Sequence, residues 1–259
     1  MTVPAAAERV LCSAHLYRQT RNTYQRFLNR EYVEYRRAGR AFYAQFVRRG
    51  DLVFDLGANR GLMAEMFLEL GARVVAVEPI PYLAATIRRR YPSRRLIVEP
   101  SAVGDHAGTA TLRLGADDLH SSISDEWIER VRNDPMLPDR WNETFEVPVR
   151  TVDDLIARHG MPAFLKIDVE GFEANVLAGL SRPVAALSFE YQCPALDMTQ
   201  RCFDRLGDLG AYEFQIAGGE QLAFREPRWT DADEAMQHLE ALRAEQPVTH
   251  GDVYARVRT

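Results

Sequence analysis

From residue 51 onward, short apolar runs alternate with segments of helical periodicity, and this alternation constrains the fold more than any other feature of the chain. Such a pattern is typical of βαβ units, in which helices cover both faces of a parallel sheet. We therefore predict an α/β domain with a doubly wound, mostly parallel, seven-stranded sheet. The predicted strands are residues 52–56, 73–78, 94–99, 164–169, 185–190, 213–217 and 252–257.

Helices are predicted between these strands, and two stretches depart from the simple alternation. The predicted helices are residues 60–70, 80–90, 151–159, 172–180, 196–209 and 231–244. Residues 108–114 indicate an added strand, whereas residues 117–141 are polar, loop-like and carry two prolines. Ligands bind at the carboxyl ends of strands in open α/β sheets, so we interpret 117–141 as an insertion that could cover a site as a lid.

The first 50 residues differ from the rest in charge and form a predicted N-terminal helical arm, with the main domain at 51–259. They hold ten arginines and three glutamates, which gives them a net charge of +7. The whole chain has a net charge of −5, so the remaining residues carry −12. A cap packed on the domain is the first interpretation of the arm. A lid, a homodimer contact and a nucleic-acid surface are alternatives, and the net negative charge of the chain disfavours the last. Apolar residues recur in it at helical spacing: Tyr24, Leu28, Tyr32, Tyr35, Phe42 and Phe46.

The cellular location is predicted from what the sequence lacks. No apolar stretch is long enough for a signal peptide or a membrane span. The three cysteines, Cys12, Cys193 and Cys202, have neither metal-ligand nor redox spacing, which favours unpaired thiols in a reducing compartment. We expect a cytoplasmic protein without a membrane partner.

A glycine turn follows the first predicted strand and leads into a helix. Gly57, Ala58, Asn59 and Gly61 allow a tight turn, and the amides that open the helix can receive a carboxylate or a phosphate. Asp55, at the end of the strand, suits an ammonium group instead. The pattern is not the dinucleotide signature Gly-x-Gly-x-x-Gly, and an acid before the first glycine would repel a pyrophosphate.

The second and third strands end in further candidate ligand contacts. Glu78, followed by Pro79, can accept hydrogen bonds from both hydroxyls of a ribose. Ser101 and Ala102 follow the third strand and could flank an adenine, although an ordinary turn explains them equally well. An acid for an ammonium group and an acid for a ribose together indicate S-adenosylmethionine as the cofactor, with S-adenosylhomocysteine as the product.

Several ordered motifs resemble those of the FkbM-type methyltransferases, over roughly residues 50–192. The matching segments are 54–61 (Phe-Asp-Leu-Gly-Ala-Asn-Arg-Gly), 77–79 (Val-Glu-Pro), 102–105 (Ala-Val-Gly-Asp), 151–155 (Thr-Val-Asp-Asp-Leu) and 166–173 (Lys-Ile-Asp-Val-Glu-Gly-Phe-Glu). The resemblance implies a class I, Rossmann-like methyltransferase domain. It also implies that the acceptor is a hydroxyl of a sugar, a polyketide or another secondary metabolite.

The segment beginning at Lys166 is unusual on chemical grounds as well. A central strand buried on both faces should be almost wholly apolar, and both Lys166 and Asp168 break that rule. Lys166 is also the single lysine among 32 basic residues. A structural ion pair of Lys166 with Asp168 or Glu190 is one interpretation, and adjustment of a catalytic carboxylate by Lys166 is another that could coexist with it.

Methylation of an alcohol needs a group that accepts the hydroxyl proton, in addition to alignment of the two reactants. The candidates are Asp168, Glu170, Glu173 and Glu190 at strand ends, and His120 in the polar insertion. Asp168 is also a candidate cofactor contact. Candidate acceptor contacts are Ser121, Ser122, Glu173 and Tyr191, although the two serines could equally cap a helix that includes Trp127.

Asp168, Glu190 and an intervening acid could hold magnesium or calcium, but no aspartate pair or Asp-Asn dipeptide follows the fourth main strand, so no metal is expected. The alternatives to an O-methyltransferase are methylation of nitrogen or a carboxyl group, a nicotinamide-dependent oxidoreductase, and a cofactor-binding module without activity.

Overall fold

The structure, a computed structural model, describes residues 30–115, 121–131, 143–219, 222–246 and 250–258. The chain divides into two compact units, Met1–Phe42 and Tyr43–Thr259. The described part of the first unit is most of helix α2 (Arg30–Tyr43), which lies in the segment predicted as a helical arm. Of the predicted lid, residues 117–120 and 132–141 lie outside the described residues.

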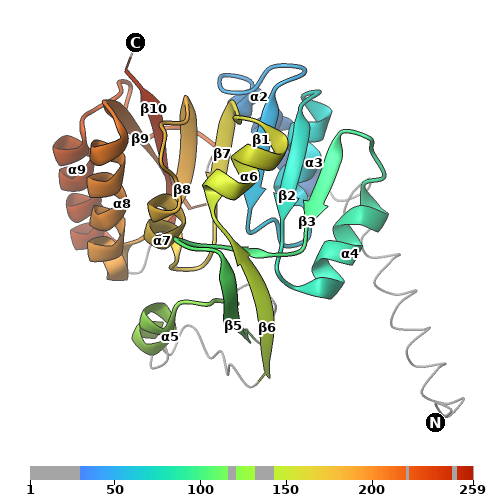
Figure 1. Cartoon of the computed structure of the whole chain (residues 1–259). Helices are drawn as coiled ribbons and strands as arrows, with labels where there is room; N and C mark the ends of the chain where they lie inside the picture. The colour runs from blue at the N-terminus through green and yellow to red at the C-terminus, as the bar shows by residue number, and fades with distance from the viewer. Residues whose placement is uncertain (1–29, 116–120, 132–142, 220–221, 247–249, 259) are drawn as a thin grey trace, which may run out of the picture. The chain divides into compact units, whose positions relative to one another are not determined.

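The second unit is built on a seven-stranded sheet with the order β3-β2-β1-β7-β8-β10-β9 (Figure 1). The neighbours from β3 to β8 are parallel, whereas β10 is antiparallel to both β8 and β9. The predicted doubly wound, mostly parallel α/β fold is therefore confirmed. The strands are β1 (Leu52–Leu56), β2 (Arg73–Val77), β3 (Leu96–Glu99), β7 (Phe164–Ile167), β8 (Ala186–Gln192), β9 (Tyr212–Gly218) and β10 (His250–Val257).

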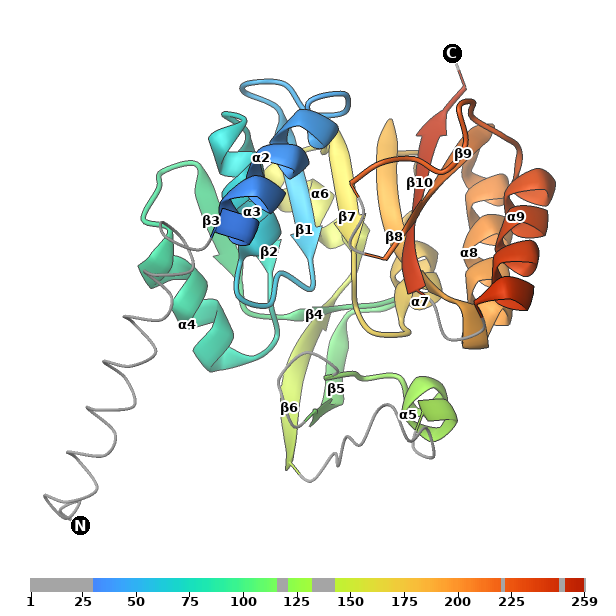
Figure 2. The same cartoon turned by 180° about the vertical axis from the view of Figure 1, so that it is seen from behind.

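Alternate residues of a strand point to opposite faces of the sheet, and both kinds are buried in β1, so helices cover both faces. On one face, Leu52, Phe54 and Leu56 of β1 join the main apolar cluster, to which α6, α7, α8 and α9 contribute their buried sides (Figure 1). Helix α3 packs on β1 and β2 on the other face (Figure 2). The helices are α3 (Leu62–Glu69), α4 (Pro81–Arg90), α6 (Val152–His159), α7 (Glu173–Ala178), α8 (Leu196–Leu209) and α9 (Ala232–Glu245).

A second, three-stranded sheet with the order β4-β6-β5 lies beyond the carboxyl ends of β1 and β7 (Figures 1 and 2). The predicted added strand is β5 (Gly108–Leu114), and it pairs with β6 (Glu143–Arg150), which was not predicted. Phe145, Val147 and Val149 of β6 alternate with more exposed residues, so a period of two was present in the sequence. The third strand of this sheet is β4 (Ala102–Val103).

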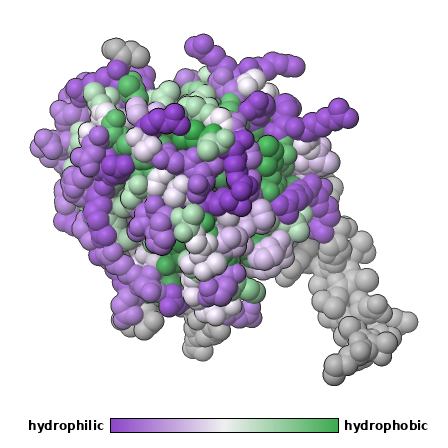
Figure 3. Space-filling view, in the orientation of Figure 1, coloured by the Kyte–Doolittle hydropathy of each residue, from purple (hydrophilic) through white to green (hydrophobic). Residues whose placement is uncertain are grey.

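The stretch predicted as loop-like contains a helix, α5 (Asp125–Val131), which includes Trp127 as the alternative interpretation of the two serines required. Its amino-terminal cap is Ser124, whose hydroxyl accepts a hydrogen bond from the amide of Trp127 at 3.1 Å. Hydrophilic residues predominate on the molecular face seen in Figure 3, and apolar residues appear there in small separate areas. Among the described residues, no helix is both long and apolar enough to cross a membrane.

Candidate functional site

The turn between β1 and α3 brings the ends of two parallel strands together. Gly57, Asn59 and Gly61 all have left-handed backbone angles, with φ of 80°, 47° and 79°. A Cβ on Gly57 would lie 1.7 Å from the carbonyl oxygen of Asp168, which follows β7. Only glycine fits there, because a side chain would collide with backbone as well as strain the turn. Gly57 therefore allows the turn after β1 to approach the segment that follows β7, the neighbouring strand of the same sheet.

Glu78, at the end of β2, is held rigidly by backbone amides. Its Oε2 accepts a hydrogen bond from the amide of Asn59 and its Oε1 accepts one from the amide of Ile80, both at 2.8 Å. Each carboxylate oxygen has two lone pairs, so one hydrogen bond from an amide does not by itself saturate it. Glu78 is thus oriented in advance at the edge of an open cavity, as a contact to ribose hydroxyls requires.

That cavity, named here the donor cavity, lies between the strand ends and the small sheet. Of the ten residues predicted to contact the cofactor, Asp55, Ala58 and Gly61 are not among those that line it. The described residues that line the donor cavity are Gly57, Asn59, Val77, Glu78, Pro79, Ile80, Ser101, Ala102, Val103, Leu112, Ser121, Ile123, Asp168, Val169 and Glu170.

Two buried oxygens near this cavity have no hydrogen-bond partner among the described residues. They are Oγ of Ser101, which lines the donor cavity, and Oδ2 of Asp55, which is buried behind it. Burial raises the pKa of Asp55 to about 6, against the opposing effect of the neighbouring Lys166. Unpartnered buried oxygens are uncommon, and a ligand that offers an amino group fits the position of Ser101, whereas Asp55, which does not line the cavity, could act on such a group only through its charge. The residues present therefore fit the predicted nucleoside with an ammonium group.

Lys166 lies in a row of polar residues that crosses five strands of the main sheet. The strand registers place Asp55, Lys166, Ser188, Tyr254 and Gln215 side by side in that order. Nζ of Lys166 lies 2.6 Å from Oδ2 of Asp168, which is the predicted ion pair. Burial alone would lower the pKa of Lys166, but Asp168, Asp252, Tyr43 and Asp55 together raise it well above the ordinary value. Lys166 is thus a permanent cation among acids.

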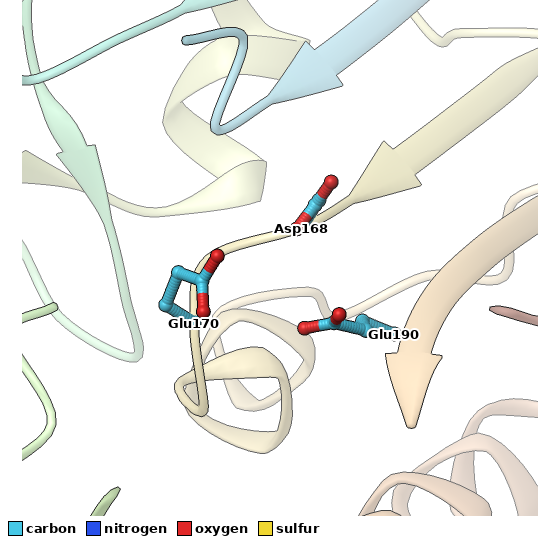
Figure 4. Close-up of side chains that lie close together, drawn as sticks. All are labelled: Asp168, Glu170 and Glu190. Carbon is cyan, nitrogen blue, oxygen red and sulfur yellow. The ribbon is translucent and has the colours of Figure 1, made fainter. Parts of the chain in front are cut away.

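Asp168, Glu170 and Glu190 come together and form what we call the carboxylate cluster. One carboxylate oxygen from each lies within 4.8 Å of the other two. Figure 4 shows Glu170, from the loop after β7, and Glu190, from β8, turned toward each other. Burial, followed by repulsion from neighbouring acids, raises the pKa of Glu170 and of Glu190 well above the ordinary value for glutamate. In the ionised form, such carboxyls are stronger bases than ordinary ones.

Three carboxylates at this separation are also a donor set that suits a hard divalent cation. Lys166 already provides one positive charge to Asp168, a member of that set. The expectation that the reaction needs no metal stays a prediction.

Glu173 supports the loop that carries Glu170. Its Oε1 accepts hydrogen bonds from the amides of Val169 at 3.1 Å and Gly171 at 3.2 Å. Glu170 between them has a left-handed backbone, with φ of 55°, which costs energy for a residue with a side chain. Burial raises the pKa of Glu173 to about 7. Glu173, predicted as a candidate base or acceptor contact, therefore shapes the loop.

The insertion is fastened to this same loop. Oγ of Ser122 donates a hydrogen bond to the carbonyl of Glu170 at 2.7 Å. The ring of Trp127 lies over Gly171, where a Cβ would come within 2.5 Å of its Cγ. Ser121 lines the donor cavity. Ser122 is buried and its hydroxyl is hydrogen-bonded to backbone, so the structure does not support its predicted contact with the acceptor. His120, the predicted alternative base, lies outside the described residues.

Two residues near Glu190 were misjudged or missed. Tyr191 belongs to the apolar cluster on the face opposite Glu190 and is 1% exposed, so the structure does not bring it to the acceptor side as predicted. Asp252, which was not predicted, pairs directly with Glu190 across β8 and β10. Burial raises the pKa of Asp252 to about 6, although Lys166 opposes the effect.

A second cavity lies on the other side of the carboxylate cluster. Asp168 and Glu170 line the donor cavity, whereas Glu190 lines the second cavity. The cluster therefore contributes residues to both cavities. The described residues that line the second cavity are Trp127, Gly171, Glu173, Glu190, Gln192, Ala195, Met198, Thr199 and Cys202.

Comparison with known proteins gives a family match over most of the second unit. The family model described as the methyltransferase FkbM domain matches residues 55–242. A 31-O-demethyl-FK506 methyltransferase, FkbM, of Streptomyces tacrolimicus is 34% identical over 162 residues, which are 52% of this chain and 61% of that protein. Ribosomal RNA small subunit methyltransferase A of Opitutus terrae is 33% identical over 105 residues, 36% of this chain and 37% of that protein. The chain thus spans less than two thirds of these curated relatives.

The solved structures to which the chain is similar are more distant. A precorrin-6y C5,15-methyltransferase from Geobacter metallireducens has a TM-score of 0.44 and 13% identity, with 85% of this chain and 86% of that chain covered. An O-methyltransferase from Bacillus cereus, solved in complex with SAH, has a TM-score of 0.43 and 14% identity, with 87% and 81% covered.

Proposed function

The chain belongs to the FkbM methyltransferase family, and we propose that it transfers a methyl group from S-adenosylmethionine to a hydroxyl group of a small metabolite. The observation that carries the proposal is the position of the carboxylate cluster, between a cavity suited to a nucleoside and a second cavity. A related protein of the same family is named as a methyltransferase of an oxygen position. An acceptor hydroxyl needs a base at such a junction.

The donor cavity supplies the groups that would hold the cofactor. Glu78 would accept hydrogen bonds from the ribose hydroxyls, because its oxygens are already oriented by the amides of Asn59 and Ile80. The free Oγ of Ser101 suits a polar edge of the adenine. Asp55 does not reach the cavity surface, so its role would be to attract the ammonium group from behind. When bound, S-adenosylmethionine supplies a methyl group on a positively charged sulfur.

Proton transfer is the step that the carboxylate cluster would assist. The acceptor oxygen bonds to the methyl carbon as the carbon–sulfur bond breaks, and the hydroxyl proton passes to the Glu170–Glu190 pair. Burial and the neighbouring acids raise the pKa of both glutamates, so either one, once ionised, binds a proton more tightly than an ordinary carboxylate. Such assistance is typically worth about 10²–10⁴-fold in rate.

Lys166 would act through Asp168 and not on the acceptor itself. It is 5% exposed, and its ammonium group is directed to Asp168. By placing a positive charge beside Asp168, it offsets the repulsion that this acid exerts on Glu170 and Glu190. Lys166 is therefore proposed as a positioning residue.

The test is methyl transfer followed by chemical analysis of the product. The protein is incubated with methyl-labelled S-adenosylmethionine and a small-molecule extract of the organism that encodes it, and labelled products are identified by mass spectrometry. A methyl ether, which resists mild alkali, is the expected product. Release of labelled methanol by mild alkali would indicate a carboxyl acceptor, and a labelled amine would indicate a nitrogen acceptor.

Calorimetry separates the remaining alternatives. Titration should give binding of S-adenosylmethionine and no binding of NAD. The reverse result would favour an oxidoreductase, and cofactor binding without transfer to any fraction would favour a binding module. Repeating the assay with a chelator tests the expectation that no metal is needed, and loss of transfer would contradict it.

A further inference from the structure

We propose that Asp252 is a positioning residue for the proposed methyl transfer, and that it holds the ammonium group of Lys166 beside Asp168 and away from Asp55. The inference rests on the proposed function and adds a residue to the same site. It follows from where Asp252 lies in the sheet, from what orients it, and from the polar groups on either side of Lys166.

Asp252 lies opposite the proposed base in the main sheet. The antiparallel register of β8 and β10 pairs it with Glu190. Side chains directly opposite each other in such a pair point to one face, with Cβ atoms about 4.5–5.5 Å apart. Val253, the next residue, belongs to the apolar cluster on the other face. Asp252 and Glu190 therefore share the face on which Lys166 lies.

Two buried tyrosines orient the carboxylate of Asp252. The hydroxyl of Tyr254 donates a hydrogen bond to Oδ2 of Asp252 at 3.4 Å, and the hydroxyls of Tyr254 and Tyr43 are 3.0 Å apart. Both tyrosines are 1% exposed. The ring of Tyr43 packs edge-on against Phe67 and Phe164, with ring centroids 5.1 and 5.8 Å away. Asp252 is therefore held by neighbours that are themselves closely packed.

Lys166 has acids on both sides of its own strand. Asp55 of β1 is its neighbour in register on one side, and Oδ2 of Asp55 has no partner among the described residues. Ser188 of β8 is its neighbour on the other side, and β10, which carries Asp252, is the next strand. Because the side chain of Ser188 is short, it separates Lys166 from Asp252 less than a longer residue would.

The charges of these acids decide which side the ammonium group takes. Nζ of Lys166 has three hydrogens to donate and gives one to Oδ2 of Asp168 at 2.6 Å. Burial disfavours the charged form of Lys166, whereas Asp168, then Asp252 and more weakly Asp55 favour it and raise its pKa well above the ordinary value. The attraction toward Asp252 thus exceeds the attraction toward Asp55. Without Asp252, the unpartnered oxygen of Asp55 becomes a stronger competitor for the ammonium group.

The place of this charge matters for the transfer step. Beside Asp168, the ammonium group offsets the repulsion that this acid exerts on Glu170 and Glu190. If Lys166 turned toward Asp55, that charge would leave the carboxylate cluster. Asp252 is not among the described residues that line the donor cavity or the second cavity, so its effect on transfer would pass through Lys166.

The position of Lys166 can be measured without any turnover, because Lys166 is the single lysine of the chain. Protein produced with lysine that carries heavy nitrogen at Nζ gives one side-chain signal by NMR. Asp252→Asn should shift that signal, and Asp252→Glu should return it toward the wild-type position. Adding Asp55→Asn to Asp252→Asn should also return it, because the competing charge is then absent.

The matched control for the NMR measurement is Glu213→Gln. It breaks the pair that Glu213 makes with Arg256 of β10 at 2.6 Å, at the other end of the strand that carries Asp252. The signal of Lys166 should stay unchanged in this variant. An unchanged signal in Asp252→Asn would overturn the inference that Asp252 places Lys166.

Turnover then tests the role of Asp252 in transfer, with the acceptor purified from the extract by its label. Asp252→Asn should lower kcat about 10–100-fold, with KM for the acceptor and affinity for S-adenosylmethionine within about twofold of wild type. Asp252→Glu should recover most of the loss, and Glu213→Gln should transfer normally. Tyr254→Phe keeps the ring and removes the hydroxyl that orients Asp252, so it guards against misfolding of Asp252→Asn and should lower kcat about three- to tenfold.

The outcomes separate this inference from the proposed function. Normal kcat in Asp252→Asn, or a loss confined to cofactor affinity, would refute the role of Asp252 and leave the proposed function in place. Absence of transfer by wild type would refute the proposed function and with it the role of Asp252 in transfer. The NMR signal would still decide, in that case, whether Asp252 places Lys166.

Discussion

The donor cavity and the carboxylate cluster lie at the same edge of one sheet, yet their polar groups are arranged in opposite ways. In the donor cavity, each carboxylate oxygen of Glu78 accepts a hydrogen bond from a backbone amide, that of Asn59 or that of Ile80. Glu170 and Glu190 face each other and Asp168, with Lys166 as the nearby cation. The first arrangement stabilises one charged form, whereas the second makes the charged form costly.

This difference teaches how one sheet edge can bind and react at once. Backbone amides give a carboxylate a fixed orientation, which suits recognition of a ligand that must not change. Crowded carboxyls share protons among themselves, which suits a step in which a proton is released. We therefore expect changes at Glu78 to alter affinity, and changes at Glu190 to alter turnover and response to pH.

The largest expected effect is on turnover in Glu190→Gln. The amide keeps the size and the hydrogen bond with Gln192 but cannot accept a proton. Loss of the base should lower kcat about 10²–10⁴-fold, with the affinity for S-adenosylmethionine within about twofold. Single-turnover transfer of labelled methyl measures the first and calorimetry the second. Asp204→Asn, on the exposed side of α8, serves as a control, and an equal loss of cofactor affinity in Glu190→Gln would contradict the division between the two regions.

The donor side was predictable because its chemistry lies in consecutive residues. Asp55 to Gly61 and Glu78 follow two predicted strands, and strand ends of a parallel sheet meet at one edge, so the turn, its glycines and the acid could be assigned from position alone. The sequence did not show that Gly57 is required by the carbonyl of Asp168. Distances between strands depend on register, which local patterns do not specify.

The acceptor side was predictable only in part for the same reason. Asp168, Glu170 and Glu190 were identified as acids at strand ends, but Asp252 reaches them through the antiparallel strand β10, whose register is set by distant pairing. Tyr191 was named as an acceptor contact next to Glu190 in the sequence, but it lies on the opposite face of the sheet, because one residue along a strand reverses the direction of the side chain. Trp127 was noted as part of a helix, and its seat on Gly171 depends on how the insertion folds back.

The next largest effect concerns folding stability and pH, through Glu173. Its pKa is about 7 in the folded chain against an ordinary value of 4.5, so the folded chain binds this proton more tightly than the unfolded chain. Stability from this group is therefore full below about pH 4.5 and is lost as pH rises to about 7, by roughly 3 kcal/mol. Burial is the main cause of the shift.

Glu173→Gln should remove that part of the pH dependence. The amide oxygen can still accept from the amides of Val169 and Gly171, and it cannot ionise. Urea unfolding should give a variant that gains stability relative to wild type between about pH 4.5 and about pH 8. A constant difference between the two proteins over that range would show that Glu173 titrates normally. Glu78→Gln, which changes a glutamate of the donor side in the same way, is the comparison variant for the same urea unfolding measurements.

A smaller effect is expected at the donor side, on affinity alone. Glu78→Ala removes the proposed ribose contact and the support for Asn59, so affinity for S-adenosylmethionine should fall about 10–100-fold. Turnover at saturating cofactor should change much less. Glu99 ends the neighbouring strand β3 in the same way but bonds His159 at 2.9 Å and does not line the donor cavity. Glu99→Ala should therefore leave cofactor affinity unchanged, and a parallel loss in both variants would point to general damage at this edge.

The smallest expected effect tests whether α5, whose Trp127 lies over Gly171, belongs to the acceptor side only. The double substitution Arg130→Ala and Arg201→Ala removes the ion pairs between α5 and α8, whose side chains are one third to one half exposed. Exposed pairs are worth about 0.2–1 kcal/mol each, so KM for the acceptor should rise about two- to fivefold, with cofactor affinity unchanged. High salt should move wild type part of the way toward the variant, because salt screens exposed charges. Arg243→Ala breaks a similarly exposed pair with Glu240 on α9 and should change neither quantity. If the double variant lowered cofactor affinity as much as it raised KM, α5 would have to be assigned to both regions. The separation of a binding side from a reacting side would then not hold at this helix.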